Sequence, residues 1–227
     1  MKVAALYDVH GNVRALEAVL ADPDVAAADI VLFGGDLASG PFPAETIELA
    51  RPISNARFVR GNADELASPT MNPAADAARR WVERRLDEER IEWLATLPFS
   101  WSADDVLYVH ANPVDVESFV TPRTSEARVL EIVASVEETT VVTGHVHVQF
   151  EREVGRVRWV GAGSVGFPYE EEPAAYWALV EDGEVSFRRT DYDVESTTAA
   201  ILASGHPRAG ELNELQATGL AWFATAS

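Results

Sequence analysis

Short apolar runs alternate with amphipathic segments through the first part of the chain. Residues 2–7 and 29–33 are apolar runs of strand length, and residues 12–20 place their apolar side chains on one helical face. A second helix is predicted over 43–51, with proline in its first turn, and a third strand is predicted to end at Gly61. This order of strand, polar loop and helix predicts an α/β fold with functional residues at the strand ends.

The pattern then changes to one typical of antiparallel hairpins. A helical stretch is predicted over 72–97, and its aromatic side chains fit packing in a core or a lid. The stretches 148–163 and 174–192 contain Val-Gly and Asp-Gly turns between alternating residues, which predicts two hairpins. The other predicted elements are strands at 99–102, 106–110 and 139–142 and helices over 126–134 and 194–203.

A chain of 227 residues is long enough for one sizeable core. We expect residues 1–203 to form one α/β domain and residues 204–227 to form a C-terminal tail that docks on this body or on a partner. The tail is apolar in part, which is compatible with a homodimer, and its apolar residues include Leu215, Leu220, Trp222 and Phe223.

Composition narrows the possible partners. The formal net charge of −19 repels polyanions, so we expect no broad nucleic-acid surface. No apolar run is long enough to span a bilayer, and the first residues lack the cleavage region of a signal peptide, so a cytoplasmic protein with no membrane contact is expected. Without cysteine, any metal must be held by histidine, carboxylate or amide side chains.

Polar side chains of metal-binding type gather at the predicted strand ends. Alone, the pair in "TGHVHV" could be one satisfied and one solvated histidine, but four of the five histidines fall at such ends. With two carboxylates and one amide they form a mixed nitrogen and oxygen set suited to Mn²⁺, Fe or Zn²⁺. Seven ligands are too many for one open catalytic metal and fit two metals that share a carboxylate. The set is Asp8, His10, Asp36, Asn62, His110, His145 and His147.

The blocks that hold these residues follow one another in a recognisable order. In that order they resemble the motifs of the calcineurin-like metallophosphoesterase superfamily, in its small bacterial and archaeal branch. One block would be weak evidence, whereas five in order are strong, and the resemblance covers residues 2–195. The blocks are Asp8-x-His10, Gly35-Asp36 with Gly40-Pro41, Gly61-Asn62-Ala63-Asp64, His110, and Gly144-His145-Val146-His147.

The resemblance implies a fold and a dinuclear site. The fold is two mixed β-sheets packed as a sandwich and flanked by helices. The metals would lie roughly 3.5–4 Å apart, with Mn²⁺ first among the candidates and Fe, Zn, Ni or Co as alternatives. One metal would be bound by Asp8, His10, Asp36 and His147, and the other by Asp36, Asn62, His110 and His145.

With two such metals, a bridging water would ionise near neutral pH and attack phosphorus in line with the leaving oxygen. The expected substrate is a small phosphate ester. Ala63 stands where many relatives carry a histidine that helps the leaving group, so we expect substrates with good leaving groups, and a phosphodiester slightly before a monoester.

Further residues are given supporting roles. Asp64 is expected outside the direct ligands, orienting a ligand histidine. Arg60 is either a surface arginine or a phosphate contact, and Asn12 either caps a helix or contacts substrate. His206 is expected to be exposed, with a role as substitute proton donor left open. Tight turns with positive φ are expected at Gly11, Gly35, Gly61 and Gly144.

A non-catalytic metal-binding scaffold is the alternative from another functional class. The resemblance includes a retromer subunit that keeps this fold and works through protein contacts. A scaffold has no need for all seven ligands, and the sequence contains all seven, so the hydrolase is the preferred interpretation.

Overall fold

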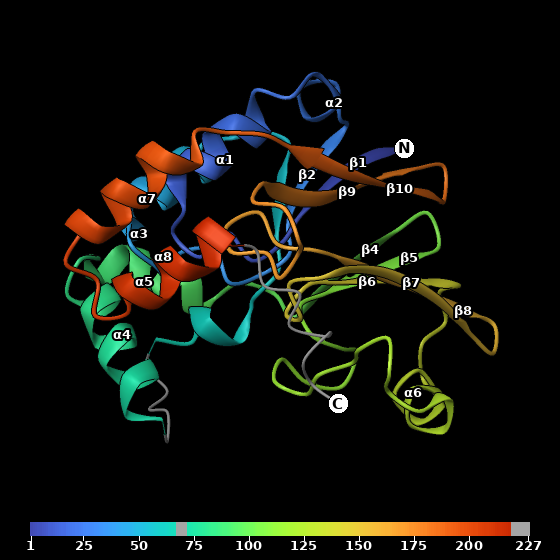
Figure 1. Ribbon diagram of the computed structural model, residues 1–227. Coiled ribbons are helices and arrows are strands. Elements are labelled where there is room, and N and C mark those ends of the chain that lie inside the picture. Colours follow the sequence, from blue (N-terminus) through green and yellow to red (C-terminus); the bar gives the residue numbers. More distant parts are fainter. Residues whose placement is uncertain (67–71, 219–227) are drawn as a thin grey trace.

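The computed structural model describes residues 1–66 and 72–218 and contains two five-stranded mixed sheets packed face to face (Figure 1). The first sheet has the order β10 (Glu184–Thr190), β9 (Ala175–Glu181), β1 (Lys2–Leu6), β2 (Ile30–Phe33) and β3 (Ala56–Phe58). The second has the order β4 (Ser100–Ala103), β5 (Val106–Val109), β6 (Thr140–Thr143), β8 (Val157–Ala162) and β7 (Gln149–Val154). This arrangement confirms the predicted fold class.

The strand directions place the loops that carry the predicted metal ligands at a common edge of the sheets. Strands β1, β2 and β3 are parallel to one another, as are β5, β6 and β8. The predicted hairpins are present as the antiparallel pairs β7–β8 and β9–β10. Because parallel strands end on the same side of a sheet, the segments that leave β1, β2, β5 and β6 can converge on one point.

The alternation of side chains along β1 shows how the layers are held together. Val3, Ala5 and Tyr7 pack in the core between the two sheets, whereas Ala4 and Leu6 face the outer helices. Both faces are buried, which explains why this strand reads as a continuous apolar run. The Tyr7 hydroxyl donates to the carbonyl oxygen of Val142 at 2.9 Å, which joins the sheets at the end that leads to the site.

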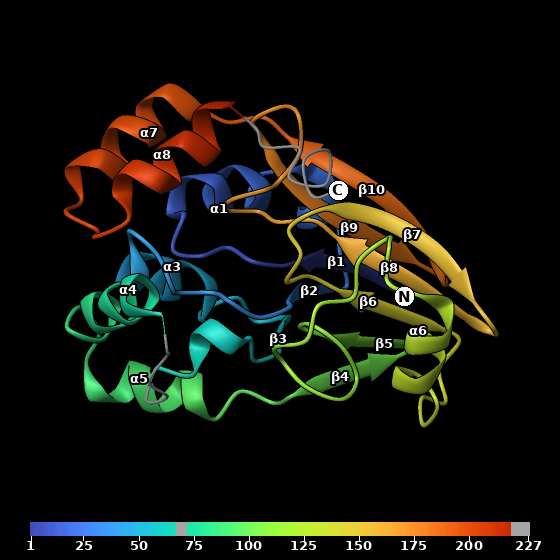
Figure 2. The same cartoon turned by 60° about the horizontal axis from the view of Figure 1, so that its bottom comes forward.

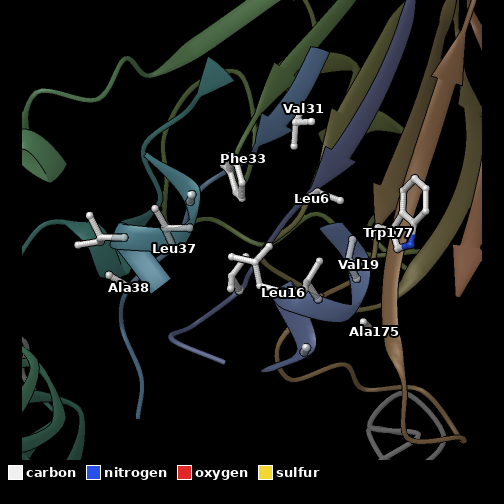
Figure 3. Close-up of a cluster of buried hydrophobic side chains, with 14 of the residues drawn as sticks. Leu6, Leu16, Val19, Val31, Phe33, Leu37, Ala38, Ala175 and Trp177 are labelled. Carbon is white, nitrogen blue, oxygen red and sulfur yellow. The ribbon is translucent and has the colours of Figure 1, made fainter. Parts of the chain in front are cut away.

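Helices cover the outer faces of both sheets. Figure 3 shows Leu16 and Val19 of α1 packed near Leu6 and Phe33 of the first sheet. No helix in the described part of the chain is long and apolar enough to cross a membrane. The helices are α1 (Val13–Leu20), α2 (Pro23–Ala26), α3 (Pro43–Ala50), α4 (Pro73–Glu83), α5 (Glu88–Ala95), α6 (Glu126–Ile132), α7 (Val194–Ala203) and α8 (Ala209–Thr218).

One predicted stretch is divided in the structure, and one predicted boundary differs from it. The helical stretch predicted over 72–97 consists of two helices, α4 and α5, because Asp87 caps the second by accepting from the Arg90 N–H. The third strand ends at Phe58, because the Arg60 N–H donates to Pro98 and a 3₁₀ turn starts at Asn62.

The C-terminal tail contains a helix that periodicity did not predict. Helix α8 follows α7 and packs against it, and the two helices lie side by side in both views (Figure 2). Its Leu212 and Leu215 face a cavity that also reaches α4. The apolar residues Leu220, Trp222 and Phe223 lie outside the described residues.

Candidate metal centre

The seven strand-end residues lie together at one edge of the sandwich. Asp8 and His10 follow β1, Asp36 follows β2, and His110 follows β5. The remaining three come from the 3₁₀ turn after β3 and from the loop after β6. Their ligand atoms form two groups, which are Asp8, His10 and His147, and Asp36, His110 and His145 with Asn62 beside them.

In the first group, three ligand atoms surround one point. His147 Nε2 lies 3.2 Å from Asp8 Oδ1 and 3.1 Å from His10 Nε2. His10 Nε2 lies 3.7 Å from the same carboxylate oxygen. Two imidazole nitrogens and one carboxylate oxygen at these separations could hold one divalent cation.

In the second group, His110 Nε2 is the central atom. It lies 3.0 Å from Asn62 Oδ1, 3.2 Å from His145 Nδ1 and 3.5 Å from Asp36 Oδ2. The set combines two imidazole nitrogens with an amide and a carboxylate oxygen. These four side chains could hold a second divalent cation.

The Asp36 carboxylate joins the two groups. Its Oδ2 lies 3.5 Å from His10 Nε2 of the first group and 3.5 Å from His110 Nε2 of the second. Its Oδ1 accepts from the Ala63 N–H at 2.7 Å, which fixes the orientation of the carboxylate. Asp36 is therefore placed to share one oxygen between two cations.

Hydrogen bonds orient all four imidazoles toward the centre. Each ring has one nitrogen at a backbone carbonyl, which can only accept, so in a neutral ring the other nitrogen carries a lone pair. These lone-pair nitrogens face one another, which is stable only with a proton or a metal cation between them. The bonds are His10 Nδ1 to Ser39 at 3.2 Å, His110 Nδ1 to Gly34 at 3.1 Å, His145 Nε2 to Glu117 at 3.0 Å and His147 Nδ1 to Phe167 at 2.6 Å.

The carboxylate of Asp8 also indicates that a cation can bind at this site. It is fully buried, and its Oδ2 accepts from the His145 N–H at 2.8 Å. Its Oδ1 accepts no hydrogen bond from any described residue. A buried, unbonded carboxylate oxygen is costly unless a cation compensates it, so the donor set fits divalent metals.

The charges of the site favour cations. Burial alone lowers the pKa of His110, but the carboxylates of Asp36 and Asp8 outweigh it and raise that pKa to about 10. Burial likewise opposes ionisation of Asp36, but the surrounding histidines hold the pKa of this carboxyl well below its usual range. The negative potential that holds a proton on His110 would also attract a metal ion, which must displace that proton.

Backbone strain is concentrated at the ligands. Left-handed backbone is rare for residues other than glycine, and where it gathers it is often associated with a functional site. These turns direct the ligand side chains toward the site. The motifs alone did not predict them. The ligands with positive φ are Asp8 at 53°, His10 at 48°, Asp36 at 53°, His145 at 65° and His147 at 58°.

Two motif glycines have a different role from the predicted one. Gly11 and Gly35 have positive φ as expected, but Gly61 has a φ of −95° and Gly144 is not in the left-handed region. They are glycine because the ligand carboxylates pass close by. A Cβ would lie 2.1 Å from Asp36 Oδ1 at position 61 and 2.2 Å from an Asp8 oxygen at position 144.

We expect Gly144→Ala to displace the Asp8 carboxylate, because the new methyl group also meets the Tyr7 ring at 2.5 Å. Misplacement by about 1 Å can cost roughly 10²-fold in rate. Bound metal after dialysis and kcat should therefore both fall. Gly210→Ala is the control, because a Cβ there meets nothing within 4 Å. Equal metal content in the two variants would contradict this interpretation.

Asp64 supports the site through the backbone. It was expected to orient a ligand histidine, but its carboxylate accepts from the N–H groups of Asp36 at 2.8 Å, Leu37 at 3.0 Å and Gly61 at 2.9 Å. Burial, together with the nearby Asp36 charge, raises the pKa of Asp64 to about 7, against these three bonds. Asp64 thus holds the Asp36 loop and the Gly61 segment together.

The two residues with open interpretations have defined surroundings. Asn12 is buried, and its Oδ1 accepts from the Ala15 N–H at 3.2 Å as the cap of α1. Its amide donates to Gly166 at 2.9 Å, so both polar ends are used inside the protein. Arg60 pairs with Glu65 at 3.2 Å and does not line the cavity at the site.

A cavity of about 650 Å³ opens over both ligand groups. Phe119 stacks on His145 and Tyr169 stacks on His147, with ring centroids 4.4 and 5.1 Å apart. Ala63 contributes a methyl group to the wall. Neither aromatic residue belongs to a motif, so the sequence analysis did not identify them. The wall also includes residues of α4 and of the C-terminal tail, among them Ala75, Ala78, Arg79, His206, Arg208, Leu212 and Leu215.

His206 differs from its prediction. It was expected to be exposed, but its side chain is 7% exposed and lies in the cavity wall. Its ring packs edge-to-face on Trp81 of α4, with centroids 4.9 Å apart. Tertiary packing of the tail on α4, which the local sequence does not reveal, accounts for the difference.

Comparisons with known proteins agree with this geometry. Residues 1–184 match the calcineurin-like phosphoesterase superfamily domain. An uncharacterized protein of Methanocaldococcus jannaschii is 24% identical over 234 residues, which covers 90% of this chain and 93% of the relative. A metallophosphoesterase structure from Sphaerobacter thermophilus is 26% identical, with a TM-score of 0.81 over 97% of this chain and 100% of that one. A hypothetical protein from Pyrococcus horikoshii OT3 is 22% identical, with a TM-score of 0.84 over 96% and 98% of the two chains. The chain therefore belongs to the calcineurin-like phosphoesterase superfamily.

Proposed function

We propose that this metal-dependent phosphoesterase hydrolyses small phosphodiesters with two divalent metals, Mn²⁺ first among them. The superfamily binds divalent metals and acts on phosphate esters. The observation that carries the proposal is the Asp36 carboxylate, which faces a nitrogen of each ligand group at 3.5 Å at the bottom of the cavity. Asp8, His10, Asp36 and His147 would hold one metal, and Asp36, Asn62, His110 and His145 the other.

Different residues would contribute to charge balance and to ligand alignment in this reaction. Bound divalent cations would ionise a water near neutral pH and neutralise charge on the phosphoryl oxygens. Asp8 and Asp36 supply two negative charges, so a site with two divalent cations keeps a net positive charge that attracts an anionic ester. Asp64 and the carbonyls beneath the histidines keep the ligands aligned before substrate arrives.

The preference for a diester rests on the wall of the cavity. At Ala63 the chain offers a methyl group, which cannot donate a proton to a leaving group. Beyond it, Ala75, Ala78, Leu212 and Leu215 make an apolar surface that could accept the second ester group of a diester. These four apolar side chains give no such gain to the free oxygens of a monoester.

The test is hydrolysis of bis(p-nitrophenyl) phosphate and p-nitrophenyl phosphate by metal-stripped protein, with Mn²⁺ added and then chelated. We expect activity to appear with Mn²⁺, to vanish on chelation, and to be higher on the diester. Higher activity on the monoester would contradict the diester preference. Silence on both esters, in protein shown to bind two metals, would support the scaffold alternative.

A further inference from the structure

The cavity contains a buried hydrogen-bond donor that the metal site does not use. His206 lies between α7 and α8, and its Nδ1 accepts from the Arg208 N–H at 3.2 Å. Burial, together with the positive charges of Arg208 and Arg85, lowers the pKa of His206 to about 4. The ring is therefore neutral near pH 7, and with a lone pair on Nδ1 its proton is on Nε2.

No hydrogen bond joins this Nε2–H to another residue within 1–66 and 72–218, and the atom is not among the fully buried unpaired ones, so it is accessible to a bound molecule. His206 is 7% exposed as a residue, and its side chain forms part of the same wall as His10, Asp36 and Ala63. A donor in this wall can bond water or a substrate atom in the cavity.

We infer that His206 is a catalytic residue that donates a hydrogen bond from Nε2 to the leaving oxygen of the substrate. This inference rests on the proposed phosphoesterase function. It assigns to His206 part of the leaving-group stabilisation that the methyl group of Ala63 cannot provide. The donor comes from the C-terminal tail, beyond the residues that match the superfamily domain.

The hydrogen bond stabilises negative charge on the leaving oxygen, and the proton stays on Nε2 of His206. When the phosphorus–oxygen bond breaks, the leaving oxygen takes the electron pair and becomes an anion. The oxygen of the attacking water forms the new bond to phosphorus and releases its proton to solvent. The Nε2–H stabilises the leaving anion without transferring its proton, and this help matters most for poor leaving groups.

Two isosteric substitutions separate this role from a structural one. In His206→Asn, the amide oxygen takes the place of Nδ1 and keeps the bond to the Arg208 N–H, but the Nε2 donor is lost. In His206→Gln, an amide N–H reaches the place of Nε2, but the Nδ1 acceptor is lost. Both variants are assayed with Mn²⁺ on aryl phosphodiesters of rising leaving-group pKa, after thermal unfolding shows that they are folded.

We expect kcat of His206→Asn to fall by roughly 10- to 100-fold on the poorest leaving groups and less on nitrophenolate. His206→Gln should stay close to the wild type. The reverse order, in which His206→Gln is impaired and His206→Asn has normal activity, would contradict the inference. It would show that His206 acts only through its hydrogen bond to the Arg208 N–H. An equal loss at every leaving group would also overturn the inference.

A binding measurement separates failure of this inference from failure of the proposed function. In the Zn²⁺-loaded protein, methyl phenylphosphonate is added as an unreactive diester analogue, and the Nε2–H of His206 is followed by ¹⁵N NMR. A shift of this signal that saturates with the analogue supports the inference even if turnover is absent. An active wild-type enzyme whose His206 signal does not move would overturn the inference and leave the proposed function intact.

Discussion

Asp36→Asn is expected to lower kcat on bis(p-nitrophenyl) phosphate by roughly 10³-fold or more, because the carboxylate at that position faces both ligand groups. An amide would present one neutral oxygen and remove one negative charge from a site that must hold two divalent cations. Both metals should be lost on dialysis, and mass spectrometry of the metal content measures this directly.

The control is Asp191→Asn, which removes an exposed carboxylate that pairs with Arg189 at 2.8 Å. It changes the net charge of the protein by the same amount without touching the site. If Asp36→Asn kept two metals and near-normal turnover, the shared position of Asp36 would have no functional meaning.

Asp64→Ala is expected to reduce the free energy of unfolding by about 3 kcal/mol or more, because three buried N–H groups lose their acceptor together. The donors belong to Asp36, Leu37 and Gly61, so the second metal-binding loop should also loosen. Urea unfolding of the metal-free protein measures the stability loss, and kcat with saturating Mn²⁺ measures the effect on the site.

Glu153→Ala provides the comparison for this variant, because it removes an exposed carboxylate on β7. Exposed substitutions usually stay within about 0.5 kcal/mol of the wild type. A variant at Asp64 that unfolded at the same urea concentration as this control would show that water replaces the carboxylate at no cost.

Several features could be predicted from the sequence because they depend on local order. The apolar runs at β1 and β2, the helix Val194–Ala203 and the two C-terminal hairpins follow from periodicity and turn chemistry alone. Strand ends carry the seven candidate ligands, and parallel strands bring their ends together, so convergence could be expected before any coordinates.

Other features depend on neighbours that are distant in the chain. Gly144 is glycine because the Asp8 carboxylate, 136 positions earlier, occupies the space of a side chain. Asp64 binds the backbone of a loop 28 residues away, where a contact to a histidine had been expected. A motif of neighbouring residues predicts neither of these contacts.

The sequence by itself determined the superfamily, the layered α/β class and the candidate ligand set, because ligand type and spacing are written into contiguous blocks. The tertiary structure alone decided the orientation of each imidazole, the left-handed turns at five ligands and the burial of His206 against Trp81. The physical reason is that orientation, strain and burial are set by atoms from several segments packed together. Short-range periodicity carries no information about which segments those are.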